Sequence, residues 1–255
     1  PCGQCVYCQA GQYNICPQIR FTGFPPYPGA LRPWIAMPLE CVFPIPGGIP
    51  METGPLLETL AVALHAVELM PPVKGKTCVV VGAGPVGLLT LAVARLQGAR
   101  VLLAVDPVPE RRAMAQVMGA EWSAAPEDEK EILAYLKKET GHGPDLLFEA
   151  AGEPVSYRMA MEWTRPGGAV CVIGIYPDGV MPFDFTPARR KELTIQLVRR
   201  SLPQNYPTAI QLVAENRLNL LPLATHIFPI AEIATAFELA SCKKDGVIKS
   251  ILKIP

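Results

Sequence analysis

The sequence predicts an α/β fold built on a doubly wound parallel sheet, and three observations carry that prediction. Between residues 78 and 198, short apolar runs alternate with longer stretches of helical periodicity. The first of these runs leads into a glycine-rich turn, G-x-G-x-x-G, at residues 82–87. Four cysteines crowd the first 16 positions and set that part of the chain apart. Strands that alternate with helices form βαβ units, whose sheet is parallel and covered on both faces.

The expected strands are continuous apolar runs, as burial on both faces of a sheet requires. They lie at residues 78–81, 101–105, 145–148, 169–173 and 193–198, with a weaker candidate at 122–124. The helices expected between them lie at residues 85–96, 109–118, 127–139 and 154–163. Apolar residues at helical spacing predict another helix at 56–67, before the sheet. Helices at 206–216 and 231–240 and a closing strand at 247–254 are expected after it.

Composition excludes several classes of protein. The 255 residues include 23 Lys+Arg and 23 Asp+Glu, and half of the chain is hydrophobic. A disordered chain needs low hydrophobicity and high net charge, and a nucleic-acid binder needs a basic excess.

Residues 77–94 carry no charge and are long enough to cross a membrane. Their glycines and β-branched residues instead predict a strand, a turn and a buried helix, so no membrane span is expected.

The N-terminal quarter should consist of loops and short extended segments, because 11 of the 28 prolines fall in the first 60 positions. Its cysteines, Cys2, Cys5, Cys8 and Cys16, have the spacing C-x2-C-x2-C-x7-C. Four thiolates close the tetrahedral shell of structural zinc. A disulfide knot and an iron-sulfur cluster are the alternatives. The other four cysteines are scattered, which argues against a secreted disulfide protein and favours zinc in a reducing compartment, the cytoplasm.

The glycine turn predicts a dinucleotide site because a strand precedes it and a helix follows it. Gly82 allows the tight turn, Gly84 lets a pyrophosphate approach the backbone, and Gly87 lets helix and strand pack closely. The helix N-terminus beyond the turn favours anions. The turn therefore indicates where the phosphates of a dinucleotide would bind.

An acid follows the second expected strand. Asp106 lies 24 residues after Gly82, where a carboxylate accepts from both ribose hydroxyls and repels the 2′-phosphate of NADP. NAD is therefore the expected cofactor, with Arg111 covering its adenine-ribose side. A helix N-cap before Pro107 is the alternative role for this acid. Ligands of open α/β sheets sit at the carboxyl ends of strands, so the loops at 149–152 and 173–175 should border the nicotinamide.

These features resemble, in this order along the chain, the zinc-containing medium-chain alcohol and polyol dehydrogenases. The closest similarity is to the sorbitol, xylitol and threonine dehydrogenase branch, and it covers essentially the whole chain. It is carried by Pro1-Cys2-Gly3-Gln4-Cys5 with Gly11, Asn14 and Cys16, by Leu56-Leu57-Glu58 with His65-Ala66, and by Thr225-His226 with Phe228-Pro229 and Ala236-Phe237.

The resemblance implies an incomplete GroES-like, β-rich catalytic lobe beside a Rossmann domain. Residues 1–65 would be a remnant of that lobe with the structural zinc loop, 66–199 the NAD-binding domain, and 200–255 the return to the catalytic lobe. Together with the strand-end argument it gives the expected cofactor contacts: Gly82, Gly84, Pro85, Val86, Gly87, Asp106, Arg111, Ala151, Ile173, Gly174, Ile175 and Arg199.

One departure from the family concerns the catalytic metal. The family holds its catalytic zinc by a Cys and a His, usually with an adjacent Glu, all upstream of the four-Cys lobe. Those positions do not exist in this sequence, so we expect an N-terminally truncated chain that is inactive by itself. Glu58 matches an acid at or next to that zinc, and a first-turn helix acid is the alternative reading. His65 should lie in the core, and His142 in an exposed loop.

The resulting hypothesis is an oxidoreductase that transfers a hydride between a polyol or secondary alcohol and NAD, with a small-molecule alcohol as substrate. A homodimer or homotetramer is expected by analogy. If 255 residues are the whole chain, a dinucleotide-binding module without dehydrogenase activity is the alternative. A third reading keeps the enzyme class but takes NADP or a quinone-type substrate. Asp106 and the cysteine cluster argue against that reading.

Overall fold

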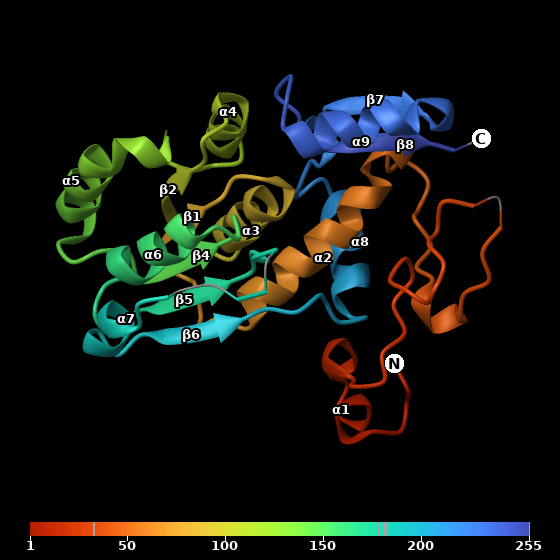
Figure 1. The fold of residues 1–255 in the computed structure, drawn as a ribbon, viewed down its shortest axis with the longest axis horizontal. Coiled ribbons are helices and arrows are strands. Elements are labelled where there is room, and N and C mark those ends of the chain that lie inside the picture. Colours follow the sequence, from red (N-terminus) through yellow and green to blue (C-terminus); the bar gives the residue numbers. More distant parts are fainter. Residues whose placement is uncertain (33, 178, 181–182, 255) are drawn as a thin grey trace.

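The computed structural model describes residues 1–32, 34–177, 179–180 and 183–254 (Figure 1). Positions 33, 178, 181, 182 and 255 lie outside the described residues. They fall in the expected catalytic-lobe remnant (1–65), NAD-binding domain (66–199) and C-terminal segment (200–255). A six-stranded sheet forms the centre of the molecule, with the strand order β3-β2-β1-β4-β5-β6 and every neighbouring pair parallel. Its strands are β1 (Thr77–Val81), β2 (Arg100–Val105), β3 (Trp122–Ala124), β4 (Leu146–Glu149), β5 (Ala169–Val172) and β6 (Thr194–Leu197).

The strand order reverses between β1 and β4. The chain first runs outward through β2 and β3, then returns to place β4 on the other side of β1. In open α/β sheets a crevice forms at the carboxyl ends of the strands where the order reverses. The glycine turn follows β1 directly, so it lies at this position.

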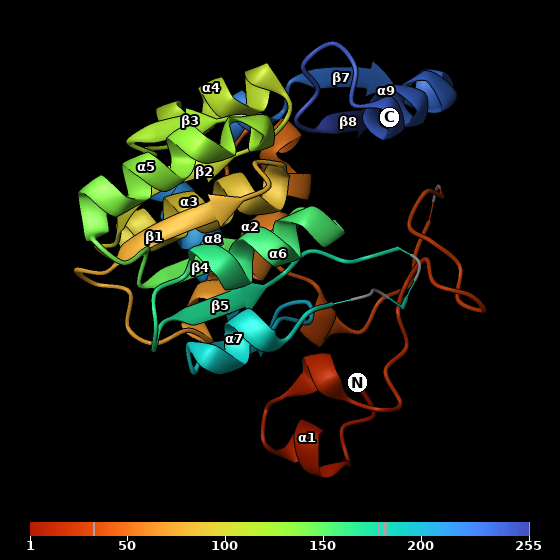
Figure 2. The same ribbon diagram turned by 60° about the vertical axis from the view of Figure 1, so that its left-hand side comes forward.

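Helices cover both faces of the sheet, as the predicted alternation requires. One core packs the sheet against α2 (Gly54–Glu68), α3 (Pro85–Leu96), α4 (Pro109–Val117) and α8 (Asn205–Ala214). A second core packs the other face against α5 (Glu129–Thr140), α6 (Pro154–Trp163) and α7 (Thr186–Arg190). Figure 2 shows α5, α6 and α7 on one side of the strands and α2 and α8 on the other. The doubly wound parallel sheet expected from the sequence is confirmed.

Burial explains why these segments fold as strands and helices. The last four residues of β1 are at most 3% exposed, which matches the continuous apolar run in the sequence. Helix α3 begins at Pro85, whose missing amide costs nothing in the first turn. Among the described residues, no helix combines the length and apolar character that a membrane span would need.

The C-terminal part adds a small separate layer. Strands β7 (His226–Pro229) and β8 (Ser250–Lys253) pair in parallel, with α9 (Ile233–Cys242) connecting them. Figure 1 shows this unit beyond the end of α2, beside α4. The sequence predicts α9 and a longer closing strand but not β7, nor the short helix α7. Both missed elements are shorter than the windows over which periodicity can be read.

The N-terminal part departs from expectation in two ways. It contains a short helix, α1 (Val6–Gln9), and single 3-10 turns where the sequence predicts no helix. Within residues 1–32 and 34–53 it forms no strand, although the resemblance implies a β-rich lobe. The prolines that interrupt this segment lack the amides that a strand ladder needs. In α1, the Cys5 side chain accepts from the Cys8 amide and supports a single turn.

Candidate functional site

The glycine turn has the geometry that a dinucleotide site requires. Gly82 has a φ of +94°, and a Cβ there would lie 2.6 Å from the Ala151 amide nitrogen. A Cβ at Gly87 would collide with the Gly82 carbonyl oxygen, so helix and strand pack directly. A Cβ at Gly84 would meet no atom of the described residues closer than 3.8 Å, at Arg111 Nη1. The turn is thus closed where it packs and open where the pyrophosphate is expected.

Asp106 joins the glycine turn to the end of β2. Its Oδ2 accepts from the Ala83 amide at 2.8 Å, and its Oδ1 accepts from the Val108 amide at 2.9 Å. The residue is only 4% exposed. Helix α4 has Val108 as its N-cap, so the N-cap role considered for Asp106 is not what the structure shows. The carboxylate fixes the two loops between which a ribose would lie.

Beside this carboxylate lies a cavity of about 270 Å³. It is bounded by the glycine turn, Asp106, the residues after β4 and the start of α6, and Arg111 lines it as expected. Three larger hollows, of about 300, 470 and 630 Å³, have linings that include neither the glycine turn nor Asp106 nor the four N-terminal cysteines. The smaller cavity is the one whose lining contains the predicted dinucleotide residues.

The C-terminal segment reaches this cavity, which the sequence does not predict. Arg111 donates from Nε and Nη2 to the Val247 carbonyl at 3.3 and 3.1 Å. Its guanidinium therefore holds a chain segment 136 residues away. Lys243, after α9, also lines the cavity. Within the described part of the chain, no hydrogen bond or ion pair engages the Lys243 ammonium group. It is a cationic residue that sequence reasoning missed, because nothing near it in the sequence marks a site.

The other expected cofactor residues gather at the ends of β4 and β5. Ala151 follows β4, while Ile173, Gly174 and Ile175 follow β5. The Ile175 side chain is 87% exposed, an apolar side chain at the edge where the nicotinamide is expected. Pro85 and Val86 are half-buried in the first turn of α3. The structure thus brings these residues to one edge of the sheet.

Arg199 lies at the same edge, after β6, but it binds the cysteine-rich segment. Asn14 Nδ2 donates to the Arg199 carbonyl at 2.8 Å, and Arg199 Nε donates to the Asn14 carbonyl at 3.2 Å. Asn14 Nδ2 also lies 3.2 Å from Nε2 of His65, which is 5% exposed and in the core as expected. His142 is exposed, also as expected. Arg199 therefore ties the N-terminal segment to the sheet.

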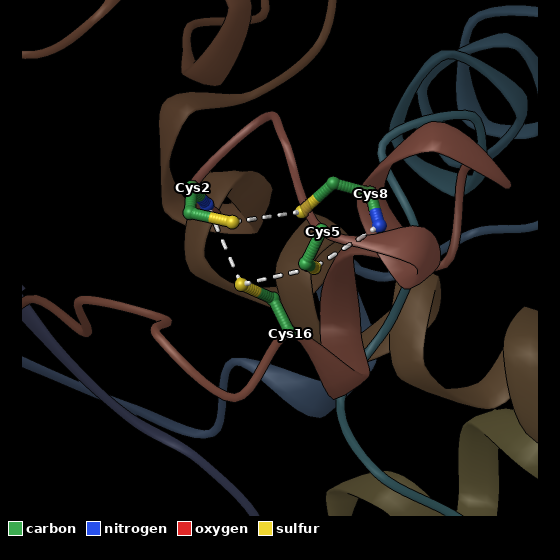
Figure 3. Close-up of side chains that lie close together, drawn as sticks. All are labelled: Cys2, Cys5, Cys8 and Cys16. Atoms are coloured by element: carbon green, nitrogen blue, oxygen red, sulfur yellow. Dashed lines mark hydrogen bonds between the residues drawn. The ribbon is translucent and has the colours of Figure 1, made fainter.

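The four N-terminal cysteines converge on one point (Figure 3). Their sulfur atoms all lie within 4.8 Å of one another, with Cys2 Sγ to Cys8 Sγ and Cys5 Sγ to Cys16 Sγ both at 3.9 Å. Four thiolates around one zinc at about 2.3 Å would stand roughly 3.8 Å apart, so the donor set fits that ion. All eight cysteines of the chain are within the described residues, and none forms a disulfide.

Backbone amides favour the thiolate form in part of this cluster. Backbone amides at Gln4 and Cys5 lower the pKa of Cys2 to about 6. Burial opposes ionisation of Cys16, but the amides of Cys2 and Gln18 bring its pKa below the usual value. Burial raises the pKa of Cys8 to about 11. Zinc binds the thiolate form, so metal binding at this cluster would release the protons of the thiols that are still protonated.

Glu58 lies on the exposed side of α2. Partial burial of the carboxyl group raises its pKa, and Lys249 acts in the opposite direction. Across residues 1–32, 34–177, 179–180 and 183–254, the cysteine cluster is the only group of three or more metal-binding side chains. In the described part of the chain, Glu58 therefore belongs to no group of three or more potential metal ligands.

Comparison with known proteins agrees with this geometry. Residues 85–215 match a family model described as zinc-binding dehydrogenase. The chain is 36% identical over 259 residues to a probable D-xylulose reductase A of Emericella nidulans, covering all of this chain and 71% of that protein. It also matches an alcohol dehydrogenase of Thermus sp. ATN1, with a TM-score of 0.90 and 29% identity over 100% of this chain and 75% of that one.

A further solved structure bears on the cofactor. It is a zinc-binding dehydrogenase of Sinorhizobium meliloti bound to NADP, 26% identical, with a TM-score of 0.87 over 100% of this chain and 74% of that one. Three findings indicate the same protein family: the glycine turn at the strand-order reversal, the four-cysteine cluster and the similarity over the whole chain. The protein is a member of the zinc-containing medium-chain alcohol and polyol dehydrogenase family of oxidoreductases.

Proposed function

We propose that this protein transfers a hydride between a polyol or secondary alcohol and NAD. The observation that carries the proposal is the Asp106 carboxylate, which joins the glycine turn to the end of β2 beside a cavity of about 270 Å³. A nicotinamide cofactor supplies the hydride chemistry, and the protein supplies binding and orientation. The D-xylulose reductase relative supports a polyol as the substrate class.

NAD is the proposed cofactor because of the same carboxylate. A carboxylate at the end of the second strand accepts from the ribose hydroxyls and repels a 2′-phosphate. Asp106 is buried and both of its oxygens already accept backbone amides, so it cannot turn away to admit a phosphate without losing two hydrogen bonds. A related zinc-binding dehydrogenase is bound to NADP, so the affinities of this protein for the NAD and NADP cofactors should be compared directly.

For the cysteine cluster we propose structural zinc. The four sulfur atoms would fill all four positions of a tetrahedral ion and leave none for a substrate. The ion would fix the segment that contains Asn14, whose hydrogen bonds hold Arg199 at the edge of the sheet. We also propose that Glu58 lies near a catalytic zinc in the loaded enzyme.

The test is a pair of fluorescence titrations with NADH and NADPH. We expect the zinc-loaded protein to bind NADH more tightly than NADPH, and Asp106→Ser to narrow the difference. Oxidation of xylitol or sorbitol with NAD, followed at 340 nm in a zinc-loaded preparation, tests the reaction. Failure to bind either reduced cofactor would overturn the proposal, and equal affinities in the wild type would overturn the choice of NAD.

The second candidate is a dinucleotide-binding module without dehydrogenase activity. It is favoured because Glu58 belongs to no group of three or more potential metal ligands in the described part of the chain. Because this chain is expected to be inactive by itself, the turnover assay separates the two candidates when the protein includes the segment with the Cys and His of the family's catalytic zinc. Tight NADH binding with no turnover of any alcohol by that zinc-loaded protein would support the module.

We further propose that the protein forms a dimer or tetramer in a reducing compartment such as the cytoplasm. Strand β6 is the last strand of its sheet, and Leu197 on it is 69% exposed. An open edge strand can pair with the same strand of a second copy. Light scattering coupled to size-exclusion chromatography gives the oligomeric state, and Leu197→Lys should shift it towards the monomer.

A further inference from the structure

Glu149, the last residue of β4, is a buried acid that the proposed function has not used. Its register partners in the sheet are Val81 on β1 and Val172 on β5, and its side chain is completely buried. A carboxyl group among valines costs free energy unless hydrogen bonds compensate for its lost hydration. An aliphatic residue would stabilise the strand more, so we expect the carboxyl group to have a role other than packing.

The Glu149 side chain holds the loop after β4. Its Oε1 accepts from the amides of Ala151 and Gly152 at 2.8 and 2.7 Å, and from Ser156 Oγ at 2.7 Å. Ser156 lies in the first turn of α6, so one oxygen atom joins the strand end, the turn and the following helix. Ala151 is among the residues expected to contact the cofactor.

The same residue also holds the end of β5. Its main-chain carbonyl accepts from the amides of Ile173 and Gly174 at 2.8 and 3.1 Å. Its Oε2 lies against Gly174, where a Cβ would be 2.6 Å from that oxygen. Tyr157 adds a second tie, because its hydroxyl donates to the Gly174 carbonyl at 2.9 Å. Both loops that should border the nicotinamide are therefore fixed to Glu149 or to its neighbours.

The loops also touch each other directly. A Cβ on Gly152 would lie 2.6 Å from the Ile175 carbonyl oxygen, and a Cβ on Gly174 would collide with the Gly152 amide. Since Gly82 approaches Ala151 just as closely, the ends of β1, β4 and β5 form one interlocked set of turns. A shift of the Glu149 carboxyl group would move this whole set.

One oxygen of the carboxyl group remains without a partner. In the described part of the chain, Oε2 is buried and takes part in no hydrogen bond. Burial raises the pKa of Glu149, against the opposing effect of the Ser156 hydroxyl and of the amides of Gly152, Ala151 and Gly174.

We propose that Glu149 is the positioning residue that sets the spacing of the two strand-end loops flanking the nicotinamide, with Tyr157 as its auxiliary. The inference rests on the proposed function, because it assumes that a nicotinamide dinucleotide binds at this edge. Glu149 is covered by the loops that it holds and acts through them. Its removal should therefore weaken the nicotinamide half of the ligand more than the adenosine half.

The experiment compares NADH with 5′-AMP on the full chain. NADH reports both halves of the site, whereas 5′-AMP reports the half bounded by Asp106 and the glycine turn. The variants are Glu149→Leu, Glu149→Gln and Tyr157→Phe. Glu162→Gln, an exposed change on α6, is the matched control. Circular dichroism establishes that each variant is folded.

For Glu149→Leu we expect the Kd for NADH to rise about tenfold, the scale of one buried hydrogen-bonding group, and that for 5′-AMP by no more than about threefold. Gln offers one acceptor and one donor in the same shape, so Glu149→Gln should bind both ligands within about threefold of wild type. Tyr157→Phe should weaken NADH alone by about threefold. The control, Glu162→Gln, should leave the Kd values for NADH and 5′-AMP unchanged.

Equal weakening of NADH and 5′-AMP by Glu149→Leu would mean a merely structural residue and would overturn the inference. If Glu149→Leu does not fold, Tyr157→Phe decides: an unchanged ratio of NADH to 5′-AMP affinity overturns the proposal. A wild type that binds neither NADH nor NADPH would instead overturn the proposed function, and this inference with it. That outcome is recognised before any variant is made.

Discussion

Asp106→Ala tests whether the Asp106 carboxylate holds the glycine turn in place. The substitution leaves the Ala83 and Val108 amides without their acceptor. Ala83 is 1% exposed, so its amide loses a hydrogen bond to a charged group and cannot regain it from water. Such a loss costs about 1.5–3 kcal/mol, and the less buried Val108 amide adds roughly 1 kcal/mol. We expect the free energy of unfolding to fall by about 2.5–4 kcal/mol.

Urea denaturation of wild type and variant measures this difference. Asp106→Asn keeps one acceptor oxygen, so it should lose about half as much stability. Asp128→Ala is the matched control, because Asp128 Oδ2 also accepts a backbone amide, that of Ala125 at 3.1 Å, but at an exposed position. A loss for Asp106→Ala no larger than that for Asp128→Ala would refute the argument that this carboxylate holds the glycine turn in place.

Three further expectations can be checked with the same protein. Lys243→Gln should weaken binding of 5′-AMP several-fold and reduce its dependence on salt, because it removes a cation that lines the cavity; calorimetry should show no change for Lys244→Gln, its neighbour outside the lining. Cys8→Ser should lower bound zinc, measured by mass spectrometry, from one ion per chain to none, and it should lower the melting temperature; retention of a full equivalent of zinc would contradict the four-thiolate site. Burial lowers the pKa of His65, so the folded state disfavours its charged form and stability should decline as the pH falls below about 6.5. His65→Gln should flatten that decline in urea titrations between pH 7 and 5, and an unchanged slope would exclude His65 as its source.

Much of the central sheet could be predicted from the sequence. The runs that became β1 and β2 are apolar without interruption, which is the pattern of strands covered on both faces. Most predicted ends differ from the observed ones by only one to three residues. The errors fall where the pattern is short or absent. Helix α7 has five residues and β7 has four, so neither completes a readable period.

The candidate site likewise has parts that could be predicted from the sequence and parts that could not. The glycine turn and the cysteine cluster are local patterns, and the structure places each as its spacing predicts. The sequence predicts that Arg111 covers the ribose side of the cofactor, and the structure adds a hydrogen bond from its guanidinium to the Val247 carbonyl. Nothing in the sequence near position 111 could reveal a partner 136 residues away.

The sequence by itself determined the parallel sheet, the glycine turn after β1, the acid after β2 and the four clustered thiols, because each depends on residues close together in the chain. Only the tertiary structure decided that Lys243 borders the cavity, that Asn14 binds Arg199, and that Glu149 holds two loops at once. These contacts join segments that the fold brings together after the local elements have formed. They depend on the packing of one element against another, a property that hydrophobic periodicity and motif spacing do not contain.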